Sequence, residues 1–94
     1  MPFRFTLAPE FKRHLKDKAV LQQGVIMRCI EQLVNNPRNP GLRTSRIEGT
    51  RDIWEARADL DNRVSWQYGE PGELIIRYHC THTEVYGRRY GRLL

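Results

Sequence analysis

Three successive stretches between residues 52 and 80 alternate apolar and polar side chains, and this alternation constrains the fold more than any other feature of the sequence. The stretches read DIWEARAD, RVSWQY and LIIRYHC, and they are separated by LDN and GEPGE, whose residues are typical of tight turns. Because successive side chains of a strand point to opposite faces, each stretch has one apolar face. The pattern predicts three strands in an antiparallel meander with one buried face.

The two faces of this meander differ in composition. The face expected to point inward carries Trp54, Ala56, Ala58, Val64, Trp66, Tyr68, Leu74, Ile76, Tyr78 and Cys80. The face expected to point outward carries Glu55, Arg57, Arg63, Ser65, Gln67, Ile75, Arg77 and His79. Neighbouring strands lie about 4.8 Å apart, so the three arginines can form one patch. Since no helix is left to cover them, the patch favours a binding surface over the plainer alternative, a solvated strand face.

Two helices precede the meander. PFRFTL alternates like a short strand. Pro9 then suits the first turn of a helix, in which Phe11 and Leu15 are spaced by four. Between Val20 and Asn35 the apolar residues follow the spacing of an amphipathic helix, and the prolines of NNPRNPG end it. A helical hairpin packed on a three- to four-stranded antiparallel sheet gives a two-layer α+β fold.

Length and cysteine content limit the class of protein. Residues 1–94 suffice for one domain. No stretch approaches the roughly 18 apolar residues of a membrane span, and the first ten residues lack the apolar block of a secretory signal. We therefore expect a cytoplasmic protein that contacts no membrane. In that reducing compartment Cys29 and Cys80 are expected to be free thiols; a disulfide between them is the alternative.

Arginine dominates the basic residues. The formal net charge is +5, and 13 arginines stand against 3 lysines. A guanidinium grips a phosphate with two hydrogen bonds, so the bias favours a nucleic acid or an acidic protein as partner. A genome rich in G and C gives the same bias without functional meaning, and the sequence leaves both interpretations open.

The segment RYHCTHTEVYGRRYGR, residues 77–92, is rich in groups that transfer protons or bind anions. His82 and Tyr86 follow the last predicted strand, at the rim of the arginine patch. Imidazole titrates near neutral pH, and arginines stabilise charge that develops on phosphate. These groups suffice for metal-independent RNA cleavage. In that reaction a base takes the proton of a 2′-hydroxyl, the oxygen attacks the adjacent phosphate, and an acid protonates the leaving oxygen.

Each of these residues also has a plainer explanation. His82 can bond a loop carbonyl, and Tyr86 can pack at the rim. His79 can be an ordinary strand residue, and Glu55 can pair with an arginine across the strands. The HCTH motif does not favour zinc, because alternation turns His79 and Cys80 to opposite faces and no second ligand pair occurs. We expect no metal and no cofactor.

Four segments, in this order and spacing, resemble the RelE/ParE superfamily of bacterial type II toxins. EFKRHLK resembles the first helix of that family, and CIEQLVNNPRNPGLRTSRIEGT resembles its second helix and the proline-broken exit. DIWEARADLDNRVSWQY resembles the paired strands that carry two arginines, and HCTHTEVY resembles the closing histidine motif. The resemblance covers nearly the whole chain and implies an α+β toxin of the RelE or YafQ type.

The resemblance also implies a function and a site. The function is ribosome-dependent cleavage of messenger RNA, by an endoribonuclease that needs no metal and inhibits translation. Its partners are mRNA, the 70S ribosome and an acidic antitoxin that wraps the toxin; operator DNA is met only through the antitoxin. The expected catalytic residues are His82, Tyr86, Arg63 and Arg57, and Glu55 is a candidate base. The expected RNA-binding residues are Arg43, Arg46, Arg77, His79, Arg88 and Arg89.

The sequence departs from the family pattern at several places. Asn62 replaces a tyrosine before the second arginine, Cys80 replaces a glycine, and the acid after the histidine is moved to Glu84. Glu55 and Arg57 stand where RelE has lysines, so a histidine-led reaction is favoured over the RelE mechanism. Two other functions stay open: a ParE-like toxin that binds DNA gyrase without cleaving RNA, and a degenerate module that only binds an antitoxin.

Overall fold

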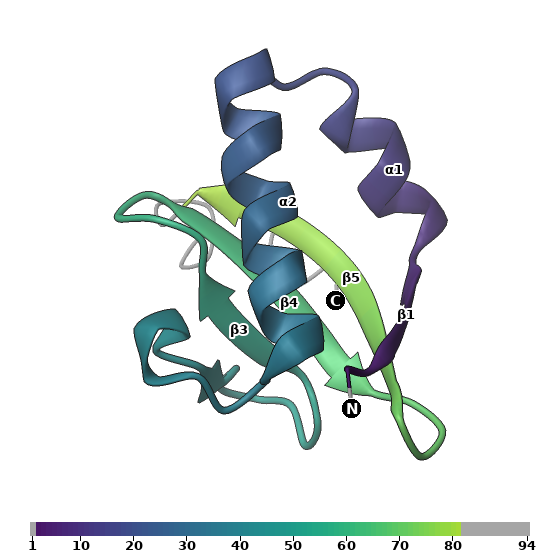
Figure 1. Cartoon of the computed structure of the whole chain (residues 1–94). Coiled ribbons are helices and arrows are strands. Elements are labelled where there is room, and N and C mark those ends of the chain that lie inside the picture. Colours follow the sequence, from purple (N-terminus) through teal and green to yellow (C-terminus); the bar gives the residue numbers. More distant parts are fainter. Residues whose placement is uncertain (1, 82–94) are drawn as a thin grey trace.

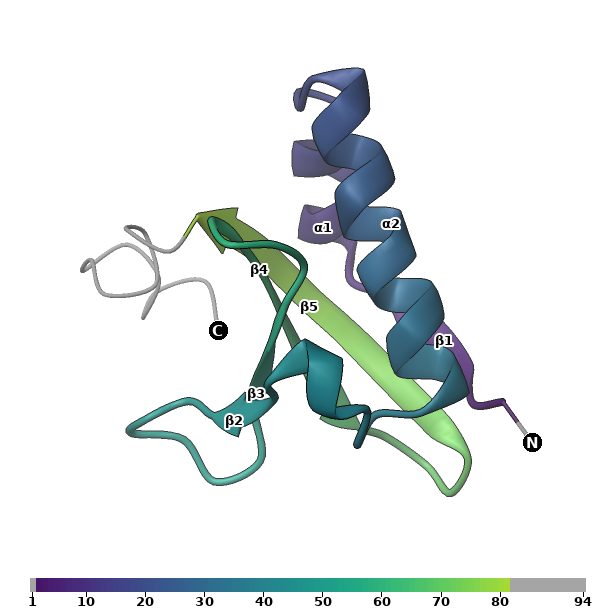
Figure 2. The ribbon, with the colours of Figure 1, turned by 60° about the vertical axis from the view of Figure 1, so that its left-hand side comes forward.

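Two helices and a five-stranded sheet form two layers in the computed structural model, which describes residues 2–81 (Figure 1). The elements along the chain are β1 (Arg4–Leu7), α1 (Pro9–Leu15), α2 (Val20–Asn35), the 3-10 helix η1 (Pro40–Leu42), β2 (Ser45–Arg46), β3 (Trp54–Arg57), β4 (Asn62–Tyr68) and β5 (Glu73–Thr81). The predicted α+β fold and both predicted helices are confirmed. In this part of the chain both helices lie on the same side of the sheet (Figure 2).

The sheet has the strand order β1-β5-β4-β3-β2. The predicted meander is present, because β3, β4 and β5 pair antiparallel in sequence order. The sheet is nevertheless mixed and not purely antiparallel, since β1 pairs parallel with β5, from Arg4 opposite Glu73 to Leu7 opposite Ile76. The helical hairpin follows β1 directly and returns the chain to the far side of the meander, so β1 runs beside the last strand in the same direction. The two-residue β2 adds an edge that the sequence did not predict.

The core lies between α2 and the sheet. The buried residues Ile26, Cys29, Ile30 and Leu33 form one face of α2, with the spacing of an amphipathic helix. They pack on residues of β3, β4 and β5 together with Phe11 of α1. Each such aliphatic side chain contributes about 1.5–3 kcal/mol through burial. The helix ends at Asn35, since Asn36 is extended and Pro37 follows it.

A β-bulge in β5 changes which side chains face the helices. Ser65 pairs with Tyr78 and Trp66 with Ile76, so Arg77 is an additional residue on one strand. A shift of one residue moves every later side chain to the other face. Opposite the core residue Val64 therefore stands His79, whereas Cys80 stands opposite Arg63.

Two predictions about this strand are therefore wrong. His79 was expected on the outward face, but it is buried, and its ring lies 4.7 Å from the ring of Phe11 in an edge-to-face contact. Cys80 was expected to join the core beside Ile76, but it takes the side of Arg63. The alternation holds up to the bulge, and the bulge has no clear signature in the sequence.

The cysteines agree with a further expectation. Cys29 and Cys80 are both buried free thiols. Burial raises the pKa of Cys29 from 9.0 to about 12, because the thiolate is disfavoured away from water. None of the helices within residues 2–81 is both long enough and apolar enough to span a membrane.

Candidate functional site

The side of the sheet opposite the helices carries three of the predicted site residues, Glu55, Arg57 and Arg63. We call it the helix-free face and define it by Glu55, Arg57, Arg63, Ser65 and Gln67. Glu55 pairs with Ser65, and Arg57 pairs with Arg63, so these residues form two adjacent rows across β3 and β4. Within residues 2–81, no helix covers this face (Figure 2).

Arg57 and Arg63 stand directly opposite each other on the last paired rung of β3 and β4. Two like charges in such a pair destabilise a sheet by themselves, and the carboxylate of Asp59 supplies an opposite charge near Arg63. A phosphate placed between the two guanidinium groups would remove the repulsion and accept hydrogen bonds from both. Of the three arginines predicted to share one patch, the structure pairs Arg57 with Arg63 directly.

The two arginines have different surroundings. Arg63 is only 3% exposed, and its Nη1 donates to the backbone carbonyls of Asp59 at 2.8 Å and Leu60 at 3.1 Å. The guanidinium is thus held in place by the turn between β3 and β4. Arg57 is exposed and lines a shallow pocket that it shares with Arg28 of α2. One arginine is fixed and the other can adjust to a ligand.

Asp59 organises the turn that holds Arg63. Its carboxylate accepts hydrogen bonds from the backbone N–H groups of Asp61 at 2.9 Å and Asn62 at 2.6 Å, and from the side-chain amide of Asn62 at 3.1 Å. Burial by itself would raise the pKa of Asp59, but these hydrogen bonds and the charge of Arg63 outweigh it and lower the pKa below 3.8. The sequence predicts a turn here but not the role of Asp59, for which an aspartate three residues before an asparagine is the available signal.

Glu55 lies two rungs from the arginine pair, on the same face of the sheet. Its Oε2 atom is buried and has no hydrogen-bond partner among the described residues. A buried carboxylate oxygen without a donor is costly, and such groups are concentrated at functional sites. The neighbours of Glu55 across the sheet are Ser45 and Ser65, which are neutral. The arrangement leaves an oxygen that can accept a proton from a ligand.

The remaining predicted RNA-binding residues are dispersed. Arg77 is the additional residue of the bulge, and it donates a hydrogen bond to Gln67 on the helix-free face. Arg46 pairs with Trp54 and is therefore on the opposite side of the sheet from Glu55. Arg43 follows η1 and lines a different pocket with Trp54. The structure does not bring Arg43 and Arg46 together with Arg57 and Arg63.

Several predicted site residues cannot be placed relative to this face. His82, Tyr86, Arg88 and Arg89 lie outside the described residues, and so does Glu84. Between residues 2 and 81, no three or more His, Cys, Asp or Glu side chains come close enough to hold a metal ion.

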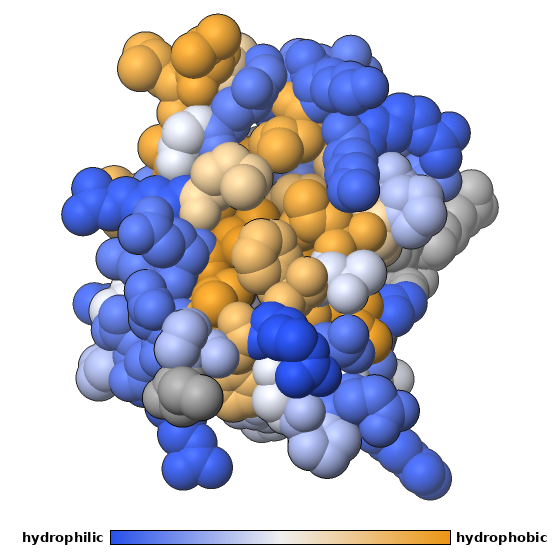
Figure 3. Space-filling view, turned by 45° about the vertical axis from the view of Figure 1, so that its right-hand side comes forward, coloured by the Kyte–Doolittle hydropathy of each residue, from blue (hydrophilic) through white to orange (hydrophobic). Residues whose placement is uncertain are grey.

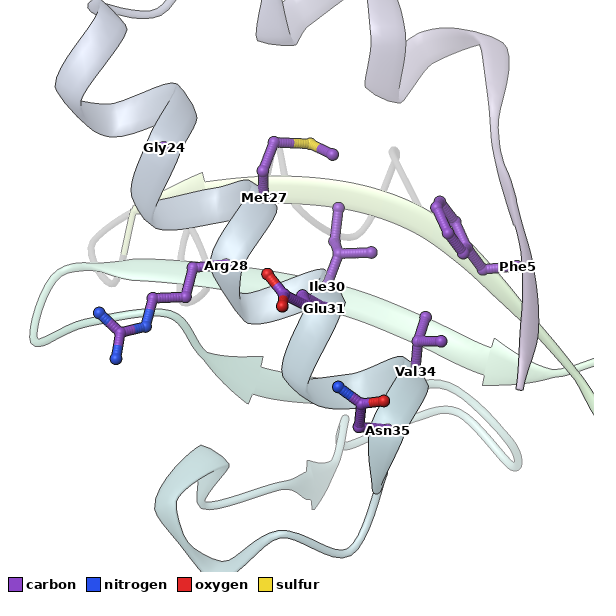
Figure 4. A pocket seen from close by; sticks show the side chains of 8 residues that line it. All are labelled: Phe5, Gly24, Met27, Arg28, Ile30, Glu31, Val34 and Asn35. Atoms are coloured by element: carbon purple, nitrogen blue, oxygen red, sulfur yellow. The ribbon is translucent and has the colours of Figure 1, made fainter. Parts of the chain in front are cut away.

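A groove of about 530 Å³ runs between α2 and β1 on the helix side (Figure 4). Its apolar lining comes from Phe5 of β1 and from Met27, Ile30 and Val34 of α2, and Arg28 and Glu31 lie at its polar rim. Phe5 is 44% exposed and Met27 39% exposed. Apolar side chains gather in a hollow on this flank of the molecule (Figure 3). A contiguous exposed apolar surface of this kind is typical of a protein-binding site.

Comparison with known proteins identifies the fold. No family model matches the chain, and no curated protein matches it significantly. Solved structures do match. The RelE protein in the archaeal RelE–RelB complex from Pyrococcus horikoshii OT3 superposes with a TM-score of 0.70 at 18% identity, over 86% of this chain and 96% of that chain.

Two structures from E. coli also superpose on this chain. A chain of the DinJ–YafQ toxin–antitoxin complex gives a TM-score of 0.72 at 12% identity, over 93% of this chain and 100% of that chain. A double mutant of the toxin RelE in the free state gives a TM-score of 0.68 at 12% identity, over 100% of both chains. The chain therefore has the RelE-like fold, and at these identities the comparison supports the fold alone.

Proposed function

We propose that this chain, which has the RelE-like fold, is the toxin of a type II toxin–antitoxin system and cleaves messenger RNA. The observation that carries the proposal is the opposed pair Arg57 and Arg63 beside the unpartnered carboxylate oxygen of Glu55. Anion binding explains the pair, and proton transfer explains the carboxylate. The structural similarity to RelE and YafQ supports the same conclusion.

In the proposed reaction, the scissile phosphate lies on Arg57 and Arg63. Glu55 takes the proton of the adjacent 2′-hydroxyl, and the 2′-oxygen attacks phosphorus. The bond to the 5′-oxygen breaks, and this oxygen takes a proton from His82 or Tyr86. The products are a 2′,3′-cyclic phosphate and a 5′-hydroxyl, with no change of oxidation state. One positioned donor that meets charge developing in the transition state is worth about 10²–10³ in rate, and Arg63 is held in place for this role.

The cellular partners follow from this proposal. The substrate is mRNA on the 70S ribosome, and the protein acts in the cytoplasm as an inhibitor of translation. Salt should weaken its attraction to RNA, because the contacts release counterions. The antitoxin is an acidic protein, and the toxin–antitoxin complex binds operator DNA only through it. We place its apolar-faced segment in the groove between Phe5 and Met27, where a helix or strand can cover exposed apolar surface.

The proposal is tested by inducing the toxin in cells and mapping mRNA ends by primer extension. Wild type should arrest growth and produce new 5′ ends within translated mRNA. Arg57→Gln and Glu55→Gln should abolish both effects. Arg51→Gln, an exposed arginine away from the face, is the matched control and should stay toxic.

The alternatives give different results. Growth arrest with intact mRNA and damaged DNA would support a gyrase-binding toxin in place of the nuclease. No growth defect without an antitoxin would support a module that only binds its partner. Full toxicity of both Arg57→Gln and Glu55→Gln would refute the assigned site.

A further inference from the structure

A second pocket, of about 450 Å³, lies where the connection after α2 passes over β3 and β4. We call it the aromatic pocket; its walls include Trp54, Trp66, Tyr68, Arg38 and Arg43. Its volume is within the range of about 300–1,000 Å³ that is usual for ligand sites. Trp54 and Trp66 are on the helix side of the sheet, so the pocket is separate from the helix-free face.

The pocket exists because α2 is too short to cover the end of the sheet. The helix ends at Asn35, and residues between Pro37 and Thr44 line the pocket together with the two tryptophans. The indole rings stack with centroids 6.2 Å apart, and Tyr68 stands edge-on to Trp66 at 5.1 Å. Tyr68 is 45% exposed. The aromatic surface that solvent reaches is therefore mainly that of Tyr68, while Trp66 is buried behind it at 1% exposure.

The polar groups of the pocket select for an anion with a hydrogen-bond acceptor. Arg38 and Arg43 are exposed, and the lining contains no carboxylate. The indole Nε1 of Trp66 is buried and has no hydrogen-bond partner in the described part of the chain. A ligand that brings an acceptor to this ring edge would satisfy the donor.

Arg43 adds an independent indication. Its φ and ψ are both 46°, in the left-handed region that favours glycine, and it is the one non-glycine residue with positive φ among those described. Strain of this kind is concentrated at binding sites, where the position of the side chain outweighs its cost. Here the strained backbone holds a guanidinium at the edge of the aromatic walls.

We propose that the aromatic pocket binds one unpaired nucleotide of an RNA strand. The base stacks on the exposed ring of Tyr68 and offers an acceptor to Trp66, while Arg38 and Arg43 hold the adjoining phosphate. An acidic peptide would also satisfy the arginines, and its carbonyl oxygens could accept from the indole N–H, so the test below includes such a peptide as the competing ligand. The inference rests on RNA as the partner proposed above and is independent of the cleavage chemistry.

The chain itself provides the probe for a test. Trp54 and Trp66 are its only two tryptophans, and both line the pocket. The full-length protein is titrated with a 2′-O-methyl oligoadenylate, which lacks the attacking hydroxyl and stays intact. Tryptophan fluorescence should be quenched to saturation. An abasic strand of the same length and inorganic phosphate at equal ionic strength should not quench.

Variants assign the signal to the pocket. Arg43→Gly removes the guanidinium at a position where glycine is favoured, so the melting temperature should not fall while affinity drops about fivefold. Tyr68→Ala should weaken binding about five- to tenfold. Arg51→Ala, an exposed arginine outside the pocket, should change affinity by less than about twofold.

Each failure has a distinct meaning. Absence of saturable quenching by the oligoadenylate, or unchanged affinity in Arg43→Gly, overturns the inference, as does stronger quenching by an acidic, phenylalanine-containing peptide. mRNA cleavage in cells without quenching leaves the proposed function standing and removes the pocket inference. Quenching without mRNA cleavage leaves the pocket inference standing and removes the proposed function.

Discussion

Replacing Arg57 with glutamine should stabilise the free protein while it abolishes the proposed activity. Arg57 and Arg63 are direct cross-strand neighbours, so their charges repel in the absence of a ligand. Arg63 cannot turn away, since its Nη1 is bonded to the carbonyls of Asp59 and Leu60. Glutamine keeps most of the length and the hydrogen-bonding capacity of arginine and removes only the charge.

The size of the effect follows from the pair. Cross-strand charge pairs are worth about 0.2–1 kcal/mol, and Arg57 is exposed, so the gain lies within this range and not above it. For a domain of this size, 1 kcal/mol shifts the melting temperature by about 4–8 °C, which gives a rise of about 1–8 °C. The gain should shrink at 1 M salt, where the Debye length is about 3 Å, compared with about 10 Å at 0.1 M.

Thermal unfolding followed by circular dichroism measures this shift at both salt concentrations. The matched control is Arg46→Gln, an exposed strand arginine that faces Trp54 and no cation. Its melting temperature should change less and should not depend on salt. If Arg57→Gln unfolds at a lower temperature than wild type, or behaves like Arg46→Gln, the arginine pair is not repulsive and the reason for a bound phosphate disappears.

Three other measurements address pH and partner binding. Because the pKa of Asp59 is lowered on folding, its stabilising contribution is present above about pH 4 and is lost as pH falls through the folded pKa; urea unfolding should show this loss, and Asp59→Asn should reduce it. Because the pKa of Cys29 is raised to about 12, stability should decrease as pH rises above about 9, and Cys29→Ala should make urea unfolding less sensitive to alkali; equal sensitivity would contradict the assignment. Met27→Glu should stop antitoxin from relieving growth arrest while toxicity remains, whereas Gln22→Glu, on the exposed part of α2, should not; rescue of both variants would exclude the groove as the antitoxin site.

Periodicity predicted most of the fold. The spacing of Ile26, Ile30 and Leu33 identified the buried face of α2, and the alternation around Trp54 and Trp66 identified the helix side of β3 and β4. Burial imposes these patterns on the sequence directly, because each apolar residue must face the core.

Features set by tertiary context were not predictable in the same way. The bulge at Arg77 moved His79 from the predicted arginine face into contact with Phe11, since pairing with β4 and not local composition decides the register. The parallel pairing of β1 also depends on where the helical hairpin returns the chain. For the site, alternation put Arg57 and Arg63 on one face of the sheet, but it gave neither their direct pairing nor the carbonyls that hold Arg63.

The pairing of Arg4–Leu7 with Glu73–Ile76 has a consequence for biosynthesis. A ribosome makes the first of these strands early and the second only after about three quarters of the chain, and the second strand is also the partner of β4. The early strand has no sheet to join until then, and pairings so distant in sequence form slowly. The sheet is therefore completed only after β5 has been made, whereas the arginine pair lies on the local β3–β4 hairpin and needs no such distant pairing.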